Sequence, residues 1–187
     1  MITIVQQENP VLRKRALEVS VAEIKSAKIK KIIQEMKKSL LSQNDGVAIA
    51  APQIGYSVRI FVVSGRIFDE RFKRSEGIPN NEPPAKPDIV FINPEFVKLS
   101  KKKKLLPEGC LSVRWLYGDV KRSTNATVSA YDEKGRKFTR VASGLLAQIF
   151  QHETDHLDGI LFIDKAENVE EHLPTENNKQ PTTDNEQ

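Results

Sequence analysis

The chain has 187 residues, of which 39% are hydrophobic and 29% are charged, and its formal net charge is +4 at pH 7. This length is sufficient for one domain with a buried core, and no apolar run approaches the ~20 residues of a membrane-spanning helix. The N-terminal residues lack the apolar stretch of a signal peptide, and the single cysteine, Cys110, excludes an intrachain disulfide. We therefore expect a cytoplasmic globular protein without a membrane partner.

The first half of the chain predicts a helix followed by strands. Residues 22–42 carry apolar side chains at three- and four-residue steps, with lysines on the opposite face, which predicts an amphipathic N-terminal helix. Residues 58–63 (VRIFVV) predict a buried strand. Residues 64–88 are rich in glycine, proline, asparagine and charge, which predicts a surface loop insertion.

Further strands are predicted after this insertion. Residues 89–93 predict one strand, and 96–106 are a candidate for another, with the run Lys101–Lys104 at its turn or on its exposed side. Residues 126–131 and 137–141 alternate around a turn sequence, which predicts a hairpin.

A late helix is predicted over residues 144–156, with Ser143 as its N-cap and Gly159 beyond its C-terminus. An early helix, antiparallel strands and a late helix are typical of an α+β fold.

Charge is distributed unevenly along the chain. Residues 165–187 contain six acidic residues and two lysines, a net charge of −4, so residues 1–164 carry +8. We expect one catalytic domain over residues 1–165 and a polar acidic tail over 166–187, largely disordered from about residue 174. The net positive charge of residues 1–164 favours acidic partners such as RNA, although solubility is the ordinary reason for a net charge.

The predicted late helix contains the sequence His152-Glu153-Thr154-Asp155-His156. Two histidines four residues apart lie on one face of a helix, which is the spacing of a divalent metal site with a glutamate beside it. A hydrolytic metal site needs three protein ligands and an open position for water. The motif supplies two ligands, so the third must come from another segment.

Three kinds of residue are candidates for the third ligand. Glu170 or Glu171, downstream, would complete the arrangement of a zinc endopeptidase. His172 lies too far from the motif for the metzincin pattern, whose corresponding position is Phe162. Cys110 offers a thiolate, a strong ligand for zinc and similar metals, although a lone cysteine in an apolar setting is more often a small buried hydrophobe.

Three segments bear on this choice: Gly46-Val-Ala-Ile-Ala-Ala-Pro-Gln53, Glu108-Gly-Cys-Leu-Ser112 and Gln151-His-Glu-Thr-Asp-His156. In this order and at this spacing, they resemble the three signature motifs of the peptide deformylases, and the resemblance covers residues 1 to about 165. It implies antiparallel β-sheets around a late metal-binding helix. It also implies a bacterial-type enzyme that removes the formyl group from the N-terminal formyl-methionine of newly synthesised polypeptides.

The resemblance implies a role for individual residues. The implied metal ligands are Cys110, His152 and His156. Glu153 matches the family's general acid/base, and Gln53 with the backbone N–H of Leu111 matches the groups that stabilise the oxyanion. Glu108 and Arg122 match a pair that holds the cysteine-bearing hairpin. The implied metal is Fe²⁺, with Zn²⁺, Ni²⁺ or Co²⁺ as replacements.

The methionine side chain of the substrate needs an apolar pocket beside the metal. The candidate substrate-binding residues are Gly46, Val47, Ala48, Leu145, Gln148 and Ile149. Ala48 stands where the family usually has a glycine, and its methyl group would clash if its φ were positive. Gln148 stands where an aliphatic residue is usual. We expect activity to survive with altered efficiency or specificity; the alternative is a catalytically weakened homologue that binds peptide.

The implied partners are formyl-methionine nascent peptides and, transiently, the ribosome. The lysine run Lys101–Lys104 is a better candidate for contact with RNA phosphates than the acidic tail. We expect the protein to be a monomer.

Overall fold

A computed structural model of the chain describes residues 3–73, 84 and 86–173. Within these residues the strands are β1 (Ala48–Ala50), β2 (Ile60–Val63), β3 (Ile89–Leu99), β4 (Lys103–Gly109), β5 (Leu116–Ser123), β6 (Asn125–Tyr131), β7 (Lys137–Ser143) and β8 (Glu167–Glu171). The helices are α1 (Ala27–Leu41), α2 (Glu70–Lys73) and α3 (Gly144–Leu157). Short 3-10 turns occur at η1 (Pro10–Arg13), η2 (Val21–Glu23), η3 (Ala51–Ile54), η4 (Gly65–Phe68) and η5 (Phe162–Asp164).

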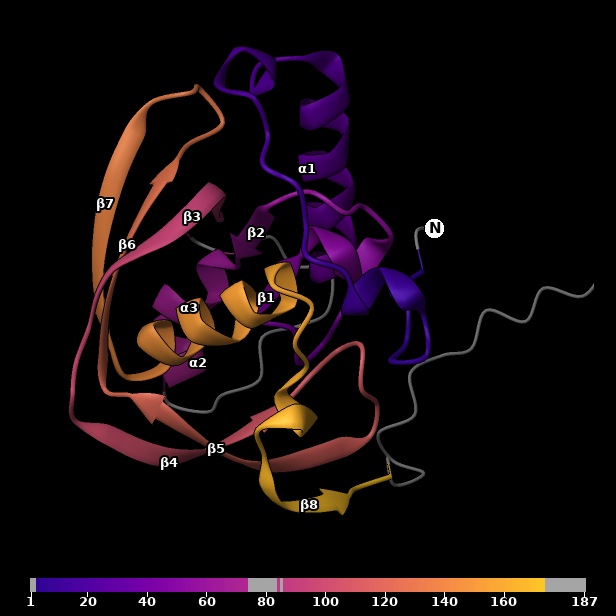
Figure 1. Ribbon diagram of the computed structural model, residues 1–187, viewed down its shortest axis with the longest axis vertical. Helices are drawn as coiled ribbons and strands as arrows, with labels where there is room; N and C mark the ends of the chain where they lie inside the picture. The colour runs from indigo at the N-terminus through magenta and orange to yellow at the C-terminus, as the bar shows by residue number, and fades with distance from the viewer. Residues whose placement is uncertain (1–2, 74–83, 85, 174–187) are drawn as a thin grey trace, which may run out of the picture.

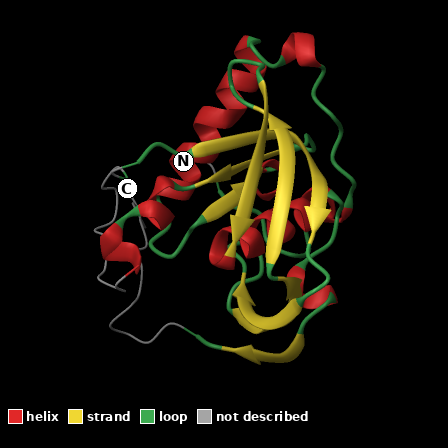
Figure 2. Ribbon diagram, turned by 90° about the vertical axis from the view of Figure 1, so that its left-hand side faces the viewer, coloured by secondary structure: helices red, strands yellow, loops and turns green. Residues whose placement is uncertain are grey.

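The strands form two antiparallel sheets (Figures 1 and 2). One sheet has the order β1-β2-β3-β6-β7, and the other has the order β4-β5-β8. The hairpin predicted around residues 132–135 is formed by β6 and β7. Helices together with purely antiparallel sheets confirm the predicted α+β class.

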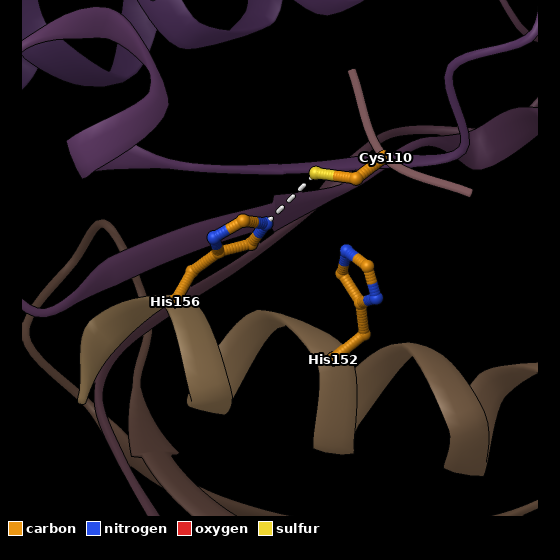
Figure 3. A group of neighbouring side chains, drawn as sticks. All are labelled: Cys110, His152 and His156. Atoms are coloured by element: carbon orange, nitrogen blue, oxygen red, sulfur yellow. Dashed lines mark hydrogen bonds between the residues drawn. The ribbon is translucent and has the colours of Figure 1, made fainter. Parts of the chain in front are cut away.

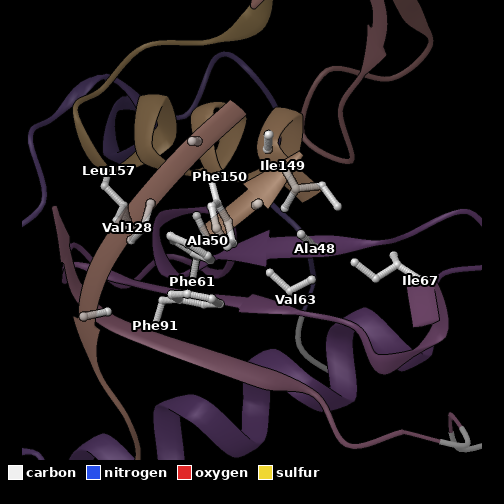
Figure 4. Packing of buried hydrophobic residues seen from close by; sticks show 14 of the residues in the cluster. Ala48, Ala50, Phe61, Val63, Ile67, Phe91, Val128, Ile149, Phe150 and Leu157 are labelled. Atoms are coloured by element: carbon white, nitrogen blue, oxygen red, sulfur yellow. The ribbon is translucent and has the colours of Figure 1, made fainter. Parts of the chain in front are cut away.

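The larger sheet lies between α1 and α3, and the alternation of its side chains explains why. In β2, Phe61 and Val63 pack in the core cluster that includes residues of α3, whereas Ile60 and Val62 pack with residues of α1. Successive side chains of a strand point to opposite faces, so a fully apolar strand such as this one buries both faces. Figure 4 shows α3 on one side of the strands. Phe150 of α3 packs against Phe61 of β2, with their ring centroids 6.1 Å apart.

Helix α1 begins later than the apolar periodicity predicts. Ser26 caps the helix, because its side chain accepts a hydrogen bond from the N–H of Ile29 at 3.3 Å. The preceding residues form the separate turn η2. The buried face of α1 comprises Ile29, Ile32, Ile33, Met36, Ser39 and Leu40.

Helix α3 is attached to the smaller sheet by the carboxamide of Gln151. Its Nε2 donates to the carbonyl of Ser123 at 3.0 Å, and its Oε1 accepts from the N–H of Ser123 at 2.9 Å. Both hydrogen bonds are buried, and buried polar pairs of this kind hold two elements in a defined register. The motif helix therefore bridges both sheets, with β4 and β5 beside its histidines.

Several segments differ from the sequence-based expectation. β3 extends to Leu99, with irregular pairing against β6, and the turn before β4 contains Lys101 and Lys102. β8, which was not predicted, pairs the start of the acidic tail with β5. The predicted insertion at 64–88 includes η4 and α2; residues 74–83 and 85, like the tail from 174, lie outside the described residues. No helix in the described part of the chain is long and apolar enough to cross a membrane.

Candidate active site

Cys110, which follows the end of β4, faces the two histidines of α3 (Figure 3). Its Sγ lies 3.2 Å from the Nε2 of His156, and the ligand atoms of Cys110, His152 and His156 all lie within 4.8 Å of one another. Bonds of about 2.0–2.3 Å from a metal to nitrogen and sulfur would fit between atoms this close. A thiolate with two imidazoles is a donor set suited to a divalent transition metal, so the structure contains a possible metal site here.

The carboxylate of Glu108 orients His152. Its Oε2 lies 2.9 Å from the Nδ1 of His152, which leaves the Nε2 of that ring for the metal site. Arg122 donates to both oxygens of Glu108, at 2.7 and 2.9 Å. Burial would raise the pKa of Glu108, but the hydrogen bonds with Arg122 and His152 outweigh it and lower the pKa to about 2. Glu108 is therefore an anion that fixes the ring orientation of a candidate ligand.

Arg122 also connects this network to the acidic residue inside the histidine motif. Its Nη1 donates to the Oδ2 of Asp155 at 2.6 Å, and Lys165 donates to the Oδ1 of the same carboxylate at 2.7 Å. The Glu108–Arg122 pair expected from the resemblance is present, and it lies between β4, β5 and α3. Truncating one member of such a buried pair would leave an uncompensated charge.

The two histidines have opposite electrostatic environments. Burial lowers the pKa of His152, but contacts with Cys110 and Glu108 outweigh burial and raise this pKa well above its usual value. Burial, with the neighbouring His152 adding to it, depresses the pKa of His156 well below its usual value. Contacts with Cys110 and Glu108 thus favour positive charge on His152, whereas burial disfavours it on His156.

Glu153 is buried beside this cluster, with only 4% of its surface exposed. Its Oε2 has no hydrogen-bond partner among the described residues. Burial is the main reason that the pKa of Glu153 rises to about 7, while His152 partly opposes the rise. A carboxyl group with a pKa near neutrality can both accept and release a proton at physiological pH.

Gln53 lies in η3, beside the turn that contains Cys110. Its Oε1 accepts a hydrogen bond from the N–H of Ala50 at 2.8 Å, so its Nε2 is directed to the Cys110 turn. That Nε2 lies 3.2 Å from the Oγ of Ser112 and 3.5 Å from the Sγ of Cys110. The N–H of Leu111 has no hydrogen-bond acceptor among the described residues. Two donors therefore lie beside the candidate metal site.

A pocket of about 300 Å³ opens onto this cluster. The six predicted substrate-binding residues all line it: Gly46, Val47, Ala48, Leu145, Gln148 and Ile149. Ala48 is an extended strand residue paired with Val63, and its φ is not positive, so the clash considered from the sequence does not occur. The amide of Gln148 is engaged with Pro107 and Glu108.

One contact at the pocket rim was not predicted. Arg114 forms a two-point ion pair with Asp45, with Nη1 to Oδ2 at 2.6 Å and Nη2 to Oδ1 at 3.0 Å. The guanidinium also stacks on Trp115, with Cζ 4.6 Å from the ring centroid. The sequence shows that Asp45 and Arg114 carry opposite charges beside two separate motifs. It does not show that they pair, because pairing depends on the tertiary structure.

The structure does not favour the endopeptidase alternative. Glu170 and Glu171 lie on the exposed edge strand β8, where Glu170 pairs with His172 at 3.2 Å. Among the described residues, Cys110 is the residue that joins both histidines of α3 in a possible metal site; Glu170 and Glu171 are not part of this group.

Comparisons with known proteins identify the family of the chain. Residues 1–172 match the family model described as polypeptide deformylase. The peptide deformylase of Desulforudis audaxviator (strain MP104C) is 38% identical over 169 residues, which cover 89% of this chain and 94% of that protein. Peptide deformylase 1A, chloroplastic/mitochondrial, of Arabidopsis thaliana is 41% identical over 162 residues, which cover 87% of this chain and 60% of that protein.

Solved structures show the same relationship. A Synechococcus elongatus peptide deformylase in complex with actinonin has a TM-score of 0.76 and 35% identity, covering 89% of this chain and 81% of that one. A class I type b peptide deformylase from Acinetobacter baumannii with bound Met-Ala-Ser has a TM-score of 0.75 and 32% identity, covering 88% of this chain and 98% of that one. The chain therefore belongs to the polypeptide deformylase family, the metal-dependent hydrolases that remove the formyl group from the N-terminal methionine of new polypeptides.

Proposed function

We propose that this deformylase binds its metal through Cys110, His152 and His156, and that the physiological metal is Fe²⁺. The convergence of one sulfur and two imidazoles beside a buried, unpaired carboxylate is the observation that carries the proposal. A thiolate suits soft and borderline metals, so Zn²⁺, Ni²⁺ or Co²⁺ can occupy the same donor set in a purified sample. Fe²⁺ itself comes from the resemblance to the family.

Glu153 is the proposed general acid/base. When bound, the divalent metal lowers the pKa of a water in its open position and polarises the formyl carbonyl. The free Oε2 of Glu153 takes a proton from the attacking water and later delivers it to the methionine nitrogen as the C–N bond breaks. Burial raises the pKa of Glu153 to about 7 in the absence of a metal, which brings this carboxyl group into the range where it exchanges a proton easily near neutral pH.

Gln53 and Leu111 are the proposed oxyanion donors. Negative charge develops on the formyl oxygen during attack, and donors held in place beforehand stabilise it without reorganisation. The hydrogen bond from Ala50 holds the Gln53 carboxamide with its Nε2 toward the site, and the Leu111 N–H is free among the described residues. Removal of one such donor typically costs about 3–4 kcal/mol of transition-state stabilisation.

The proposed pocket for the methionine side chain is lined by Val47, Leu145 and Ile149, together with the other residues predicted to bind substrate. Gly46 lies at its edge, where an added Cβ would come within 2.9 Å of the Leu40 side chain. The close approach explains why the chain has a glycine at this point. The segment from Gly46 to Ala48 is the proposed binding edge for the peptide backbone.

Contact with the ribosome is proposed through Lys101–Lys104. All four lysines are exposed, in the turn before β4 and in its first residues. Clustered lysines attract nucleic-acid phosphates, and this attraction weakens as salt increases. Replacing all four with glutamine should reduce co-sedimentation with ribosomes at low salt; unchanged co-sedimentation would refute this contact. A cytoplasmic location and a monomeric state stay predictions.

The main proposal is tested with a formyl-methionine tripeptide. Protein prepared without oxygen, with its metal content measured, should release formate, whereas the Glu153→Ala variant with equal metal content should not. Absence of formate release from a fully loaded parent protein would contradict the proposal. Metal loading that survives substitution of Cys110 would contradict the ligand set.

A further inference from the structure

Gln148 connects the two segments that carry the candidate metal ligands. It lies on α3 four residues before His152, so both side chains share one helix face. Its Nε2 donates to the backbone carbonyl of Pro107 at 2.9 Å, on β4 and three residues before Cys110. The same nitrogen lies 3.3 Å from the Oε1 of Glu108. One carboxamide therefore joins the histidine-bearing helix to the cysteine-bearing strand.

The contact with Glu108 completes the hydrogen bonding of that carboxylate. Its Oε1 accepts from the Nε of Arg122 at 2.7 Å and from Gln148. Its Oε2 accepts from the Nη2 of Arg122 at 2.9 Å and faces the Nδ1 of His152 at 2.9 Å. An ionised carboxylate has about four lone-pair sites, so each of them has a partner when Gln148 is present.

An aliphatic side chain at position 148 would remove one of these four donors. Glu108 is 6% exposed, so the vacated site on Oε1 would have little water to replace the lost donor. Arg122 could not compensate, because its remaining Nη1 is engaged with Asp155 at 2.6 Å. Glu108 would then keep only its two hydrogen bonds with Arg122 and its contact with His152, so both the carboxylate and the His152 ring would be less firmly held.

We propose that Gln148 is a positioning residue that acts through Glu108 on His152 and, through Pro107, on the Cys110 segment. This inference rests on the proposed metal site. Outer partners of metal-binding histidines typically change metal affinity by 10- to 100-fold, and Gln148 is one hydrogen bond further from the metal. Its amide nitrogen is engaged by two acceptors of the protein, so Gln148 serves the metal site rather than the recognition of a polar substrate side chain.

The test is the rate at which metal leaves the protein. The parent and the variants Gln148→Met and Gln148→Asn are loaded with Co²⁺ to equal, measured content, and release to excess chelator is followed by the Co²⁺ absorption bands. Methionine keeps the length of the side chain without the donor, and asparagine keeps the amide but is one methylene too short to reach. Both variants should release Co²⁺ faster, by about 3- to 30-fold.

Leu145→Met is the matched control. Leu145 lies on the same helix and lines the same pocket, but it has no polar group to offer Glu108. Its substitution should leave the rate of Co²⁺ release unchanged. Thermal unfolding of the metal-free proteins shows whether each variant keeps its fold. If Gln148→Met perturbs the pocket, Gln148→Asn still tests the inference.

Two outcomes would overturn the inference. Release rates equal to the parent's in both Gln148 variants would show that the hydrogen bonds do not affect the metal site. A change only in the preference for the first residue of the peptide would show that Gln148 acts on the substrate side chain and not on the metal site. Because release is measured without peptide, a loaded protein that fails to deformylate refutes the proposed function alone. An active protein with unchanged release rates refutes this inference alone.

Discussion

Gln53 and Ala50 are joined by a hydrogen bond within one turn of chain, from the Ala50 N–H to the Gln53 Oε1 at 2.8 Å. Because the oxygen of the carboxamide is engaged, its nitrogen is the atom that faces the Cys110 turn. The partner there is the Oγ of Ser112, at 3.2 Å, and Ser112 is fully buried. The turn η3, at the end of the first signature motif, thus presents a hydrogen-bond donor in a defined orientation.

Substitution of Gln53 by alanine should therefore lower kcat by about 10²- to 10³-fold, as expected for the loss of one oxyanion donor. KM and metal content should change little, because the donor acts mainly on charge that develops during the reaction. Ser112→Ala is the control, since it removes an acceptor of the Gln53 amide and leaves the amide in place. A Gln53→Ala variant with the kcat of the parent would exclude Gln53 from the oxyanion site.

Substitution of Cys110 by alanine should abolish stable metal binding. The remaining two histidines are a weak site for a divalent ion, because structural and catalytic sites ordinarily use three or four protein ligands. Glu170→Ala and Glu171→Ala should retain the metal, since both residues lie on the exposed strand β8. Metal analysis after gel filtration distinguishes the variants. Metal loss from either glutamate variant would revive the endopeptidase ligand set.

The two histidines of the candidate metal site were predictable because their geometry is local. A spacing of four residues places His152 and His156 on one face of any helix, and α3 has nearly the predicted bounds. The contact of Gln148 with Pro107 was not predictable, because the two residues are 41 positions apart and meet only through packing of α3 on β4. β8 gave no signal either, since all five of its residues are exposed and show no alternation.

Ionisation of Glu153 should make the metal-free protein less stable at higher pH. Its pKa in the folded state is about 7, against an ordinary value of 4.5, so its protonated form favours folding. The contribution is complete below about pH 4.5 and is lost as the pH rises through 7, and it amounts to about 3 kcal/mol at most. Glu153→Gln cannot ionise and should lack this loss.

Chemical denaturation of the two metal-free proteins at pH 5, 6, 7 and 8 measures the effect as a difference in unfolding free energy. The variant should gain on the parent with each step, chiefly between pH 5 and 7, and little between pH 7 and 8. Metal binding should reduce the effect, because a nearby cation favours the carboxylate. Parallel stability curves for parent and variant would contradict the raised pKa of Glu153.

Ala48→Gly should lower stability without much effect on catalysis. Ala48 is 7% exposed and extended in β1, and its methyl group packs in the core cluster with Val63 and Ile149. Loss of one buried methyl group and the added flexibility of glycine in a strand together cost about 1–2 kcal/mol. We expect kcat/KM to change by less than about twofold, or ~0.4 kcal/mol. A large gain in kcat/KM would show that the methyl group obstructs the cleft.

The Arg114–Asp45 pair should affect substrate binding more than chemistry, because it joins the two rims of the pocket outside the metal cluster. Asp45 is half-exposed, so we expect the pair to contribute about 0.5–1 kcal/mol to substrate binding. Arg114→Ala or Asp45→Asn should therefore increase KM by about two- to fivefold. The double variant should be no worse than either single one, because both remove the same contact. High salt should bring the parent closer to the variants.

Arg136→Ala is the matched control, since Arg136 forms a comparable exposed pair with Asp132 in the hairpin between β6 and β7. Its KM should equal that of the parent at every salt concentration. Steady-state kinetics with a formyl-methionine tripeptide at low and high salt distinguishes the sites. A fall in kcat at constant KM in Arg114→Ala would contradict a role at the rim, because a residue that acts only on binding leaves the chemical step unchanged.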